Sequence, residues 1–232
     1  MRLSQLDRRD LTNRVMTGAD ADRSSFVESN LSRVDADHVN FNSSLMGGVI
    51  LRDANVEFST FQKSRMSNAN FARSMITEAD FTDAKLTNAD FSNVEWQNYN
   101  ANNYIRDGYK SVTFDYANLT NANFRNATLD YASFNGAAPV KADFRDAVLN
   151  NANFDSTMSG DANFTGANLT DATFRNASLN RAKFNDAELT GVDFTDANIE
   201  TADFAGSNWQ DAILTDQQRQ YLELRYGDIE DL

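Results

Sequence analysis

Large apolar residues recur at every fifth position along most of the chain, and a small residue stands two positions before each of them. In FTGANLTDATFRNASLNRAKF (164–184), Phe and Leu alternate at the large positions, and Ala occupies 167, 172, 177 and 182. An α-helix repeats every 3.6 residues and a strand every two, so neither has a period of five. The pattern instead predicts a backbone that turns by a quarter after each five-residue unit.

Two blocks carry this period in different registers. The second runs from Val112 to Leu214, and only Pro139 and Ser159 interrupt its column of large residues. The first runs back from Trp96 and fades toward Met16. Four units would make a coil of 20 residues, and positions 20 apart are indeed alike. Phe occupies 114, 134, 154, 174 and 194, and it also occupies 124, 144, 164, 184 and 204.

This like-on-like repeat is what a stack of coils requires, with Ala at inward positions that have no room for a larger side chain. We therefore expect one solenoid interrupted once. The expected parts are an N-terminal cap (1–15), a first solenoid block (16–96), a projecting loop (97–111), a second block (112–214) and a C-terminal helix with an acidic tail (215–232).

The interruption, QNYNANNYIRDGYKS (97–111), is aromatic, rich in Asn and out of register. Loops of this length without secondary structure of their own often carry function. The alternative is an insertion tolerated at a coil corner. If the loop binds a partner, its candidate contact residues are Tyr99, Tyr104, Arg106 and Tyr109.

The C-terminal segment changes character. Thr215 or Asp216 is a suitable N-cap, helix formers follow, and Gly227 is a stop signal, so a short helix is expected. Its apolar residues can cover the open end of the last coil or form a homodimer contact. The candidate dimer contacts are Tyr221, Leu222, Leu224 and Tyr226.

The units ANLTD, ATFRN, ASLNR, AKFND and ADFTD closely resemble the pentapeptide-repeat pattern A-(D/N)-(L/F)-x-x, so the chain is identified as a member of that family. The resemblance implies an all-β, right-handed quadrilateral β-helix with a short C-terminal α-helix. Within the family, the quinolone-resistance proteins that protect DNA gyrase dimerise through such a helix and resemble B-DNA in width and charge. The segment 217–229 is loosely similar to those helices, which implies a DNA-mimicking homodimer that binds DNA gyrase or topoisomerase IV.

Residues able to do chemistry are scarce. The chain has no Cys, and His38 is its single histidine, so no thiolate metal site and no Ser-His-Asp set stand out. The pairs Asp20/Asp22 and Asp35/Asp37 are explained by the preference of the repeat for Asp before its large residue, and the N-x-S/T triplets arise in the same way. We therefore expect a non-enzymatic protein without cofactor, metal or catalytic residue. No apolar run of 18 residues occurs, and the expected location is the cytoplasm.

Charge is distributed unevenly. The net charge of −13 argues against direct binding of nucleic acid through phosphate contacts. Residues 186–232 hold twelve acids and two bases, whereas residues 1–96 hold fourteen acids and eleven bases. Such an end can steer a partner with a basic surface, although acidic surfaces also serve solubility. The candidate partner contacts are Asp186, Glu188, Asp193, Asp196, Glu200, Asp203 and Asp211. The alternative function is a structural or interaction scaffold for a partner other than a topoisomerase.

Overall fold

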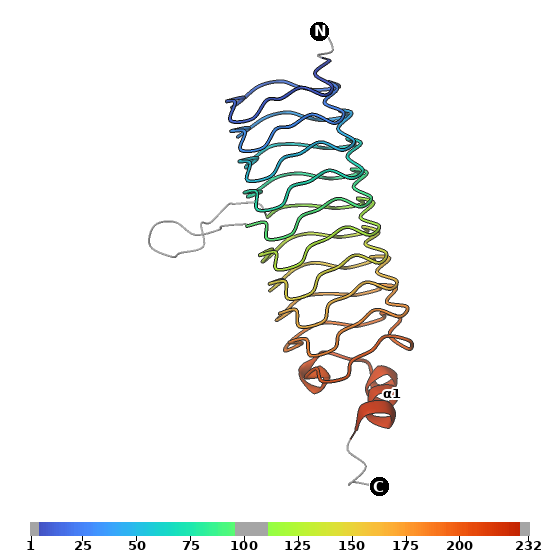
Figure 1. The fold of residues 1–232 in the computed structure, drawn as a ribbon. Helices are drawn as coiled ribbons and strands as arrows, with labels where there is room; N and C mark the ends of the chain where they lie inside the picture. Colours follow the sequence, from blue (N-terminus) through green and yellow to red (C-terminus); the bar gives the residue numbers. More distant parts are fainter. Residues whose placement is uncertain (1–4, 96–110, 228–232) are drawn as a thin grey trace.

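The computed structural model describes residues 5–95 and 111–227, which form one stack of coils with a helix at its C-terminal end (Figure 1). Isolated parallel bridges join residues 20 apart, from Gln5 with Ser25 onward, so each coil holds four five-residue units. Across the interruption Asp80 pairs with Thr113, 33 residues further on, and the same four columns continue. The two registers are therefore one solenoid, as predicted.

Each unit ends in a tight turn. The backbone N–H of Ser29 donates to the carbonyl of Phe26 at 3.0 Å, and Glu28, the third residue of that turn, has a φ of 57°. A positive φ at this position defines a type II turn, and side chains branched at Cβ fit it poorly. None of the positive-φ corner residues in the described part is Val, Ile or Thr. Where Thr201 stands at a corner its φ is not positive, and its Oγ1 accepts the Arg181 N–H at 2.9 Å.

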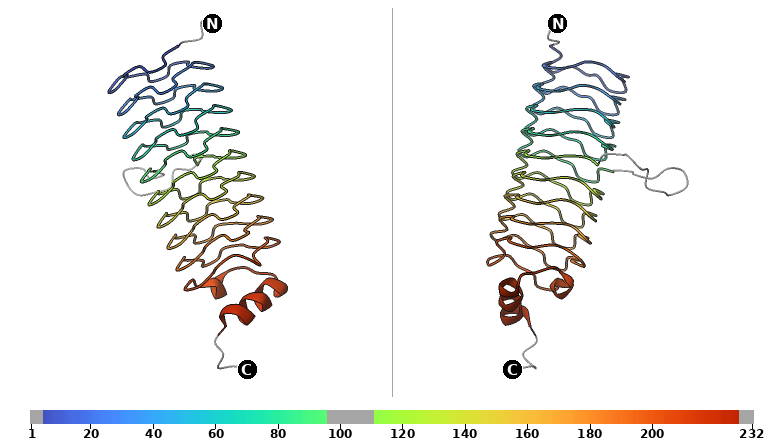
Figure 2. Two further views of the ribbon diagram at one scale, coloured as in Figure 1. Left: turned by 45° about the vertical axis from the view of Figure 1, so that its right-hand side comes forward. Right: turned by 180° about the vertical axis from the view of Figure 1, so that it is seen from behind.

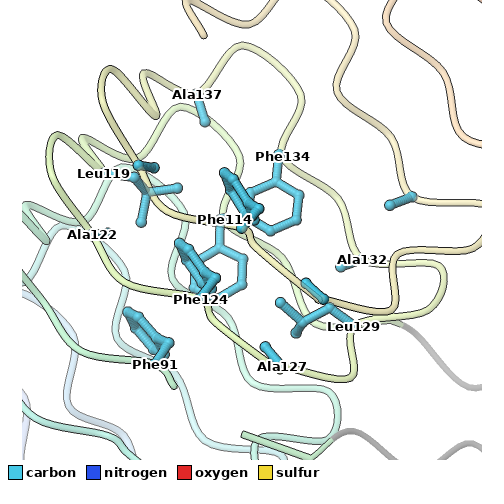
Figure 3. Packing of buried hydrophobic residues seen from close by; sticks show 14 of the residues in the cluster. Phe91, Phe114, Leu119, Ala122, Phe124, Ala127, Leu129, Ala132, Phe134 and Ala137 are labelled. Carbon is cyan, nitrogen blue, oxygen red and sulfur yellow. The ribbon is translucent and has the colours of Figure 1, made fainter. Parts of the chain in front are cut away.

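The core is a continuous column of inward side chains. Phe residues on two opposite faces stack along the solenoid axis, as Phe144 does on Phe164 with ring centroids 4.8 Å apart. Across the interior the two ladders meet edge to face, as Phe114 does with Phe124 at 5.4 Å (Figure 3). The other two faces contribute mainly aliphatic residues, and Ala or Ser fills the small inward positions. The inward columns read from the sequence are confirmed.

Polar residues just before the large ones hold the turns. The side chain of Asn168 accepts the backbone N–H of Thr170 at 3.1 Å, and Asn40 does the same for Asn42 at 3.0 Å. Asn and Asp are suited to this local capping of a turn. The preference of the repeat for Asn or Asp therefore has a structural cause in the units that carry this bond.

A short 3-10 helix, η1 (Trp209–Asp211), precedes the α-helix α1 (Asp216–Tyr226), which lies across the C-terminal end of the coils (Figure 2). Thr215 is the N-cap of α1, and its hydroxyl and the Gln218 side chain form a capping box. Gly227 follows the last turn. The predicted helix and both of its end signals are confirmed.

Within the expected N-terminal cap (1–15), residues 5–15 already follow the coil geometry, since Asp10 and Val15 bridge to the next coil. Trp96, most of the expected loop and the last five residues lie outside the described residues. The handedness of the winding stays a prediction.

Candidate functional site: the acidic C-terminal end

The seven acids proposed from sequence surround the end of the solenoid instead of forming one patch. Their bridges and turns place Asp193 and Asp196 on one face and its corner, with Glu200 at the next corner. Asp203 and Asp186 belong to the third face and its corner, and Glu188 and Asp211 belong to the fourth. A partner that contacts all of them must therefore wrap around the end.

Three of these acids serve the fold. Asp193 accepts the backbone N–H of Thr195 at 2.9 Å, and Asp203 accepts that of Ala205 at 3.2 Å. Glu188 accepts the Thr190 N–H at 2.9 Å and the side-chain amide of Asn208 at 2.6 Å. Hydrogen bonds from the Thr190 hydroxyl and backbone and from Asn208 lower the pKa of Glu188.

The pKa of Asp203 is lowered as well, first by the Asn185 side chain and then by the Ala205 N–H and the Tyr226 hydroxyl, against an opposing effect of burial. In both Glu188 and Asp203, donors of the same chain favour the charged form of the carboxylate. They contribute charge to the surface, but their positions are fixed by turn geometry.

The corner acids are different. The carboxylates of Asp186, Asp196 and Glu200 are exposed and accept no hydrogen bond within residues 5–95 and 111–227. Asp186 lies over Gly206, where an added Cβ would come within 2.2 Å of its Oδ1. Asp211 accepts one bond, from Asn208 at 3.1 Å. The structure thus separates the acids available to a partner from those occupied by the fold.

The charges of this end are only slightly compensated, since residues 186–232 hold two bases against twelve acids, and one of them, Arg225, helps to lower the pKa of Asp203. Every ion pair found in the described part of the chain involves residues N-terminal to Asp186, the last being Arg181 with Asp161 at 2.7 Å. Acids gathered in this excess at one end create a negative potential that reaches about one Debye length, roughly 8–10 Å at physiological salt.

The helix residues proposed as dimer contacts mostly face their own solenoid. Leu222 is fully buried, the Tyr221 hydroxyl donates to the Glu200 carbonyl, and the Tyr226 hydroxyl accepts the Phe204 N–H at 3.2 Å. Leu224 alone of the four is well exposed, at 81%. The structure therefore assigns α1 the capping role, and a dimer contact through Leu224 stays a prediction. The loop candidates Tyr99, Tyr104, Arg106 and Tyr109 lie outside the described residues.

His38 occupies a corner of the second coil, far along the chain from the acidic end. Its ring stacks on Phe58 with centroids 4.7 Å apart, and its Nδ1 lies 2.8 Å from Asp37. No group of three or more metal-ligating side chains occurs among the residues described. Over the same residues, no helix has the length and apolar character needed to cross a membrane.

Sequence reasoning missed the residues that α1 brings to the last coil. A cavity of about 580 Å³ lies between α1 and the last coil. It is lined by Asp196, Asn198 and Glu200 on the coil and by Asp216, Gln217 and Gln218 on the helix side. Polar residues with no apolar periodicity give no signal for a buried contact, and Gln218 is buried here.

Comparison with solved structures finds the same architecture in QnrB1, and it also finds HetL at a lower TM-score. A trypsin-treated variant of QnrB1, described as a plasmid-mediated fluoroquinolone resistance protein, is 18% identical, and the alignment covers 97% of each chain with a TM-score of 0.56. Full-length QnrB1 is 19% identical over 98% of this chain and 99% of its own, with a TM-score of 0.50. HetL of the cyanobacterium Nostoc, involved in regulating heterocyst differentiation, is 23% identical over 90% and 88%, with a TM-score of 0.40.

At these identities the structural likeness speaks to fold alone. No curated protein matches in sequence. Family descriptions, however, match most of the chain: "Pentapeptide repeats (8 copies)" over 15–53 and 50–93, "Pentapeptide repeat region" over 109–184 and "Pentapeptide repeats (9 copies)" over 155–216. With the five-residue period, the bridged coils and these matches together, the chain belongs to the pentapeptide-repeat family.

Proposed function

We propose that this protein is a non-enzymatic binding protein whose acidic C-terminal end engages a basic surface of a protein partner. The observation that carries the proposal is the set of corner carboxylates, Asp186, Asp196 and Glu200, which are exposed and lack ion-pair and hydrogen-bond partners in the described part of the chain. Charged groups that the fold does not use remain available for electrostatic steering of a partner.

The proposed partner is a type II topoisomerase, DNA gyrase or topoisomerase IV, with the protein acting as a DNA mimic. Two features support this choice. The fold is similar to QnrB1, a fluoroquinolone resistance protein, over nearly the whole of both chains. The acids also surround the end of a rod, so negative charge faces outward in every direction, as it does around a DNA duplex.

The test is a gyrase supercoiling assay with and without a fluoroquinolone, using three proteins. The first is the intact chain, and the second is Asp186→Asn/Asp196→Asn/Glu200→Gln. The third, Glu57→Gln/Glu78→Gln/Asp83→Asn, removes the same charge from the first block; Asp83 occupies the same corner column as Asp196. We expect inhibition or drug protection by the intact chain and the control, and its loss in the C-terminal variant. No effect of the intact chain on gyrase or topoisomerase IV refutes the topoisomerase proposal.

Dimerisation is a separate part of the proposal. Leu224 projects from α1 with 81% of its surface exposed, so a twofold contact between two copies of α1 would bury it. Light scattering of the intact chain and of Leu224→Asp tests this contact. A dimer that Leu224→Asp converts to monomer supports it, and a monomeric intact chain refutes it.

The alternative, a scaffold for a different protein, rests on the same acidic end together with the near balance of charge in the first block. It predicts capture of a partner other than a topoisomerase, with binding that weakens in the C-terminal acid variant.

A further inference from the structure

The last coil of a solenoid has an open edge, because no further coil pairs with its backbone. Here α1 covers part of that edge with side chains. The Gln218 amide donates to the carbonyls of Phe194 at 2.8 Å and Ala197 at 2.9 Å, and the Tyr221 hydroxyl donates to the Glu200 carbonyl. Side chains of the helix thus bond three carbonyls of the last coil, and that of Ala197 is one that pairs with a following coil elsewhere, as Ala177 accepts the Asn198 N–H at 2.9 Å.

Two backbone donors of the same edge are left uncovered. One coil earlier, the N–H groups of Asn176 and Leu179 donate to the next coil, each at 3.1 Å. Their equivalents in the last coil, the N–H groups of Asp196 and Ile199, have no partner in the described part of the chain. Ile199 is only 2% exposed, and buried backbone donors are nearly always paired. This edge therefore retains the capacity to pair with another backbone.

The uncovered edge lies in a cavity of about 580 Å³ between the last coil and α1. Its lining runs from Asp196 to Glu200 on the coil, and from Thr215 to Gln218 plus Tyr221 on the helix side. Ala197 and Ile199, both nearly buried, and three acids, Asp196, Glu200 and Asp216, are lining residues. No Lys or Arg is among them.

These features select one class of occupant. An anion at the N-terminus of α1 would meet three carboxylates, which opposes the attraction that such helix ends have for negative charge. A metal ion has no supporting group of ligands in the described residues. An extended peptide with Lys or Arg side chains fits these features, since its carbonyls can accept the free N–H groups and its cationic side chains can approach the three carboxylates.

We propose that this cavity binds an extended basic segment of the protein partner by strand addition to the edge at Ala197–Glu200. The proposal rests on the proposed function, because it identifies where the acidic end contacts its basic partner. Backbone pairing with Asp196 and Ile199 fixes the register of the segment, and the carboxylates of Asp196, Glu200 and Asp216 select its cationic side chains.

The test uses the full chain and, as the probe, an acetylated and amidated hexapeptide in which Arg and Ala alternate, so that its Arg side chains share one face of a strand. NMR titration at low salt should show saturable binding, together with slowed hydrogen exchange of the Asp196 and Ile199 amides. Asp196→Asn/Glu200→Gln should weaken binding about tenfold, as expected for two partly exposed charge pairs.

The matched control is Asp186→Asn/Asp211→Asn, which removes the same charge at the same end from acids that do not line the cavity. Equal weakening by both double variants would show that the peptide senses only the overall field, and it would overturn the proposal. Saturable binding without protection of the two amides would overturn strand addition.

The gyrase assay separates this inference from the proposed function. If the cavity variant loses peptide binding but still acts on the topoisomerase, the proposed function stands and the cavity is not its contact. If the peptide binds as expected while the intact chain has no effect on gyrase or topoisomerase IV, the strand-addition site stands and the topoisomerase proposal fails.

Discussion

Truncating a Phe in the middle of a ladder should cost far more than truncating one at its end. Phe164 is fully buried and stacks on Phe144 at 4.8 Å and on Phe184 at 5.0 Å. It also meets Phe154 and Phe174 edge to face, each at 5.5 Å. Phe164→Ala therefore removes four aromatic contacts in addition to opening a cavity.

Phe204, at the end of the same ladder, provides the comparison. It is also fully buried, but among the described residues its ring pairs with two others, Phe184 at 5.1 Å and Phe194 at 5.6 Å. A buried Phe→Ala change costs about 3–5 kcal/mol, and each aromatic pair adds about 0.5–1.5 kcal/mol beyond burial. The two extra pairs should make Phe164→Ala more destabilising than Phe204→Ala by about 1–3 kcal/mol.

The measurement is urea unfolding followed by circular dichroism, with equal m-values required for a direct comparison of the free energies of unfolding. Phe58→Ala serves as a control, because Phe58 is at a corner and stacks on His38 at 4.7 Å outside the core. It should cost no more than about 1.5 kcal/mol. Equal costs for Phe164→Ala and Phe204→Ala would refute the reasoning that ring-on-ring contacts, and not burial alone, stabilise the stack.

Three further changes test other features of the coil. Ala167→Leu places a large side chain at a buried small position and should destabilise by about 1–3 kcal/mol through overpacking, whereas the same change at exposed Ala205 should have little effect on the urea midpoint. Ser159 stands in the inward column of Leu119 and Leu179, so Ser159→Leu should raise the free energy of unfolding by about 1–2 kcal/mol; destabilisation would show that Pro139 and Thr157 already fill the space. The lowered pKa of Asp203, caused first by its hydrogen bond from Asn185, stabilises the fold above the unfolded pKa of about 3.9. The stability advantage of the wild type over Asp203→Ala in thermal melts should therefore shrink as pH falls through and below this value, and a constant difference between pH 7 and pH 3 would contradict the assignment.

The solenoid could be predicted from sequence because the same packing requirement recurs in every coil. A side chain that points inward in one coil must stack on its equivalent 20 residues later, so a two-column pattern identifies the fold even where single units such as Pro139 depart from it. The break in register at 97–111 was equally visible, and the bridge from Asp80 to Thr113 shows that the coils resume in the same columns.

The candidate site could be predicted only as a region. Counting acids located the charged end, but it did not distinguish Asp193, which accepts a turn N–H, from Asp196, which has no such bond. The cavity beside α1 could not be predicted, because it depends on how the helix docks. That docking is fixed by Gln218 and Leu222, one polar and one apolar residue in a segment without periodic apolar spacing.

The corner acids are informative because the fold does not require them. A corner with positive φ favours Gly, Asn and Asp, and Asn176 occupies the corner one coil before Asp196 with a φ of 58° against 59°. Asn would satisfy the same backbone geometry without charge, whereas the acids that cap turns contribute to folding as anions. The negative charge at Asp186 and Asp196 is therefore surplus to the architecture of the coil. These charges are available to a partner. Substitutions at Asp186 and Asp196 can therefore reduce binding without reducing the stability of the fold.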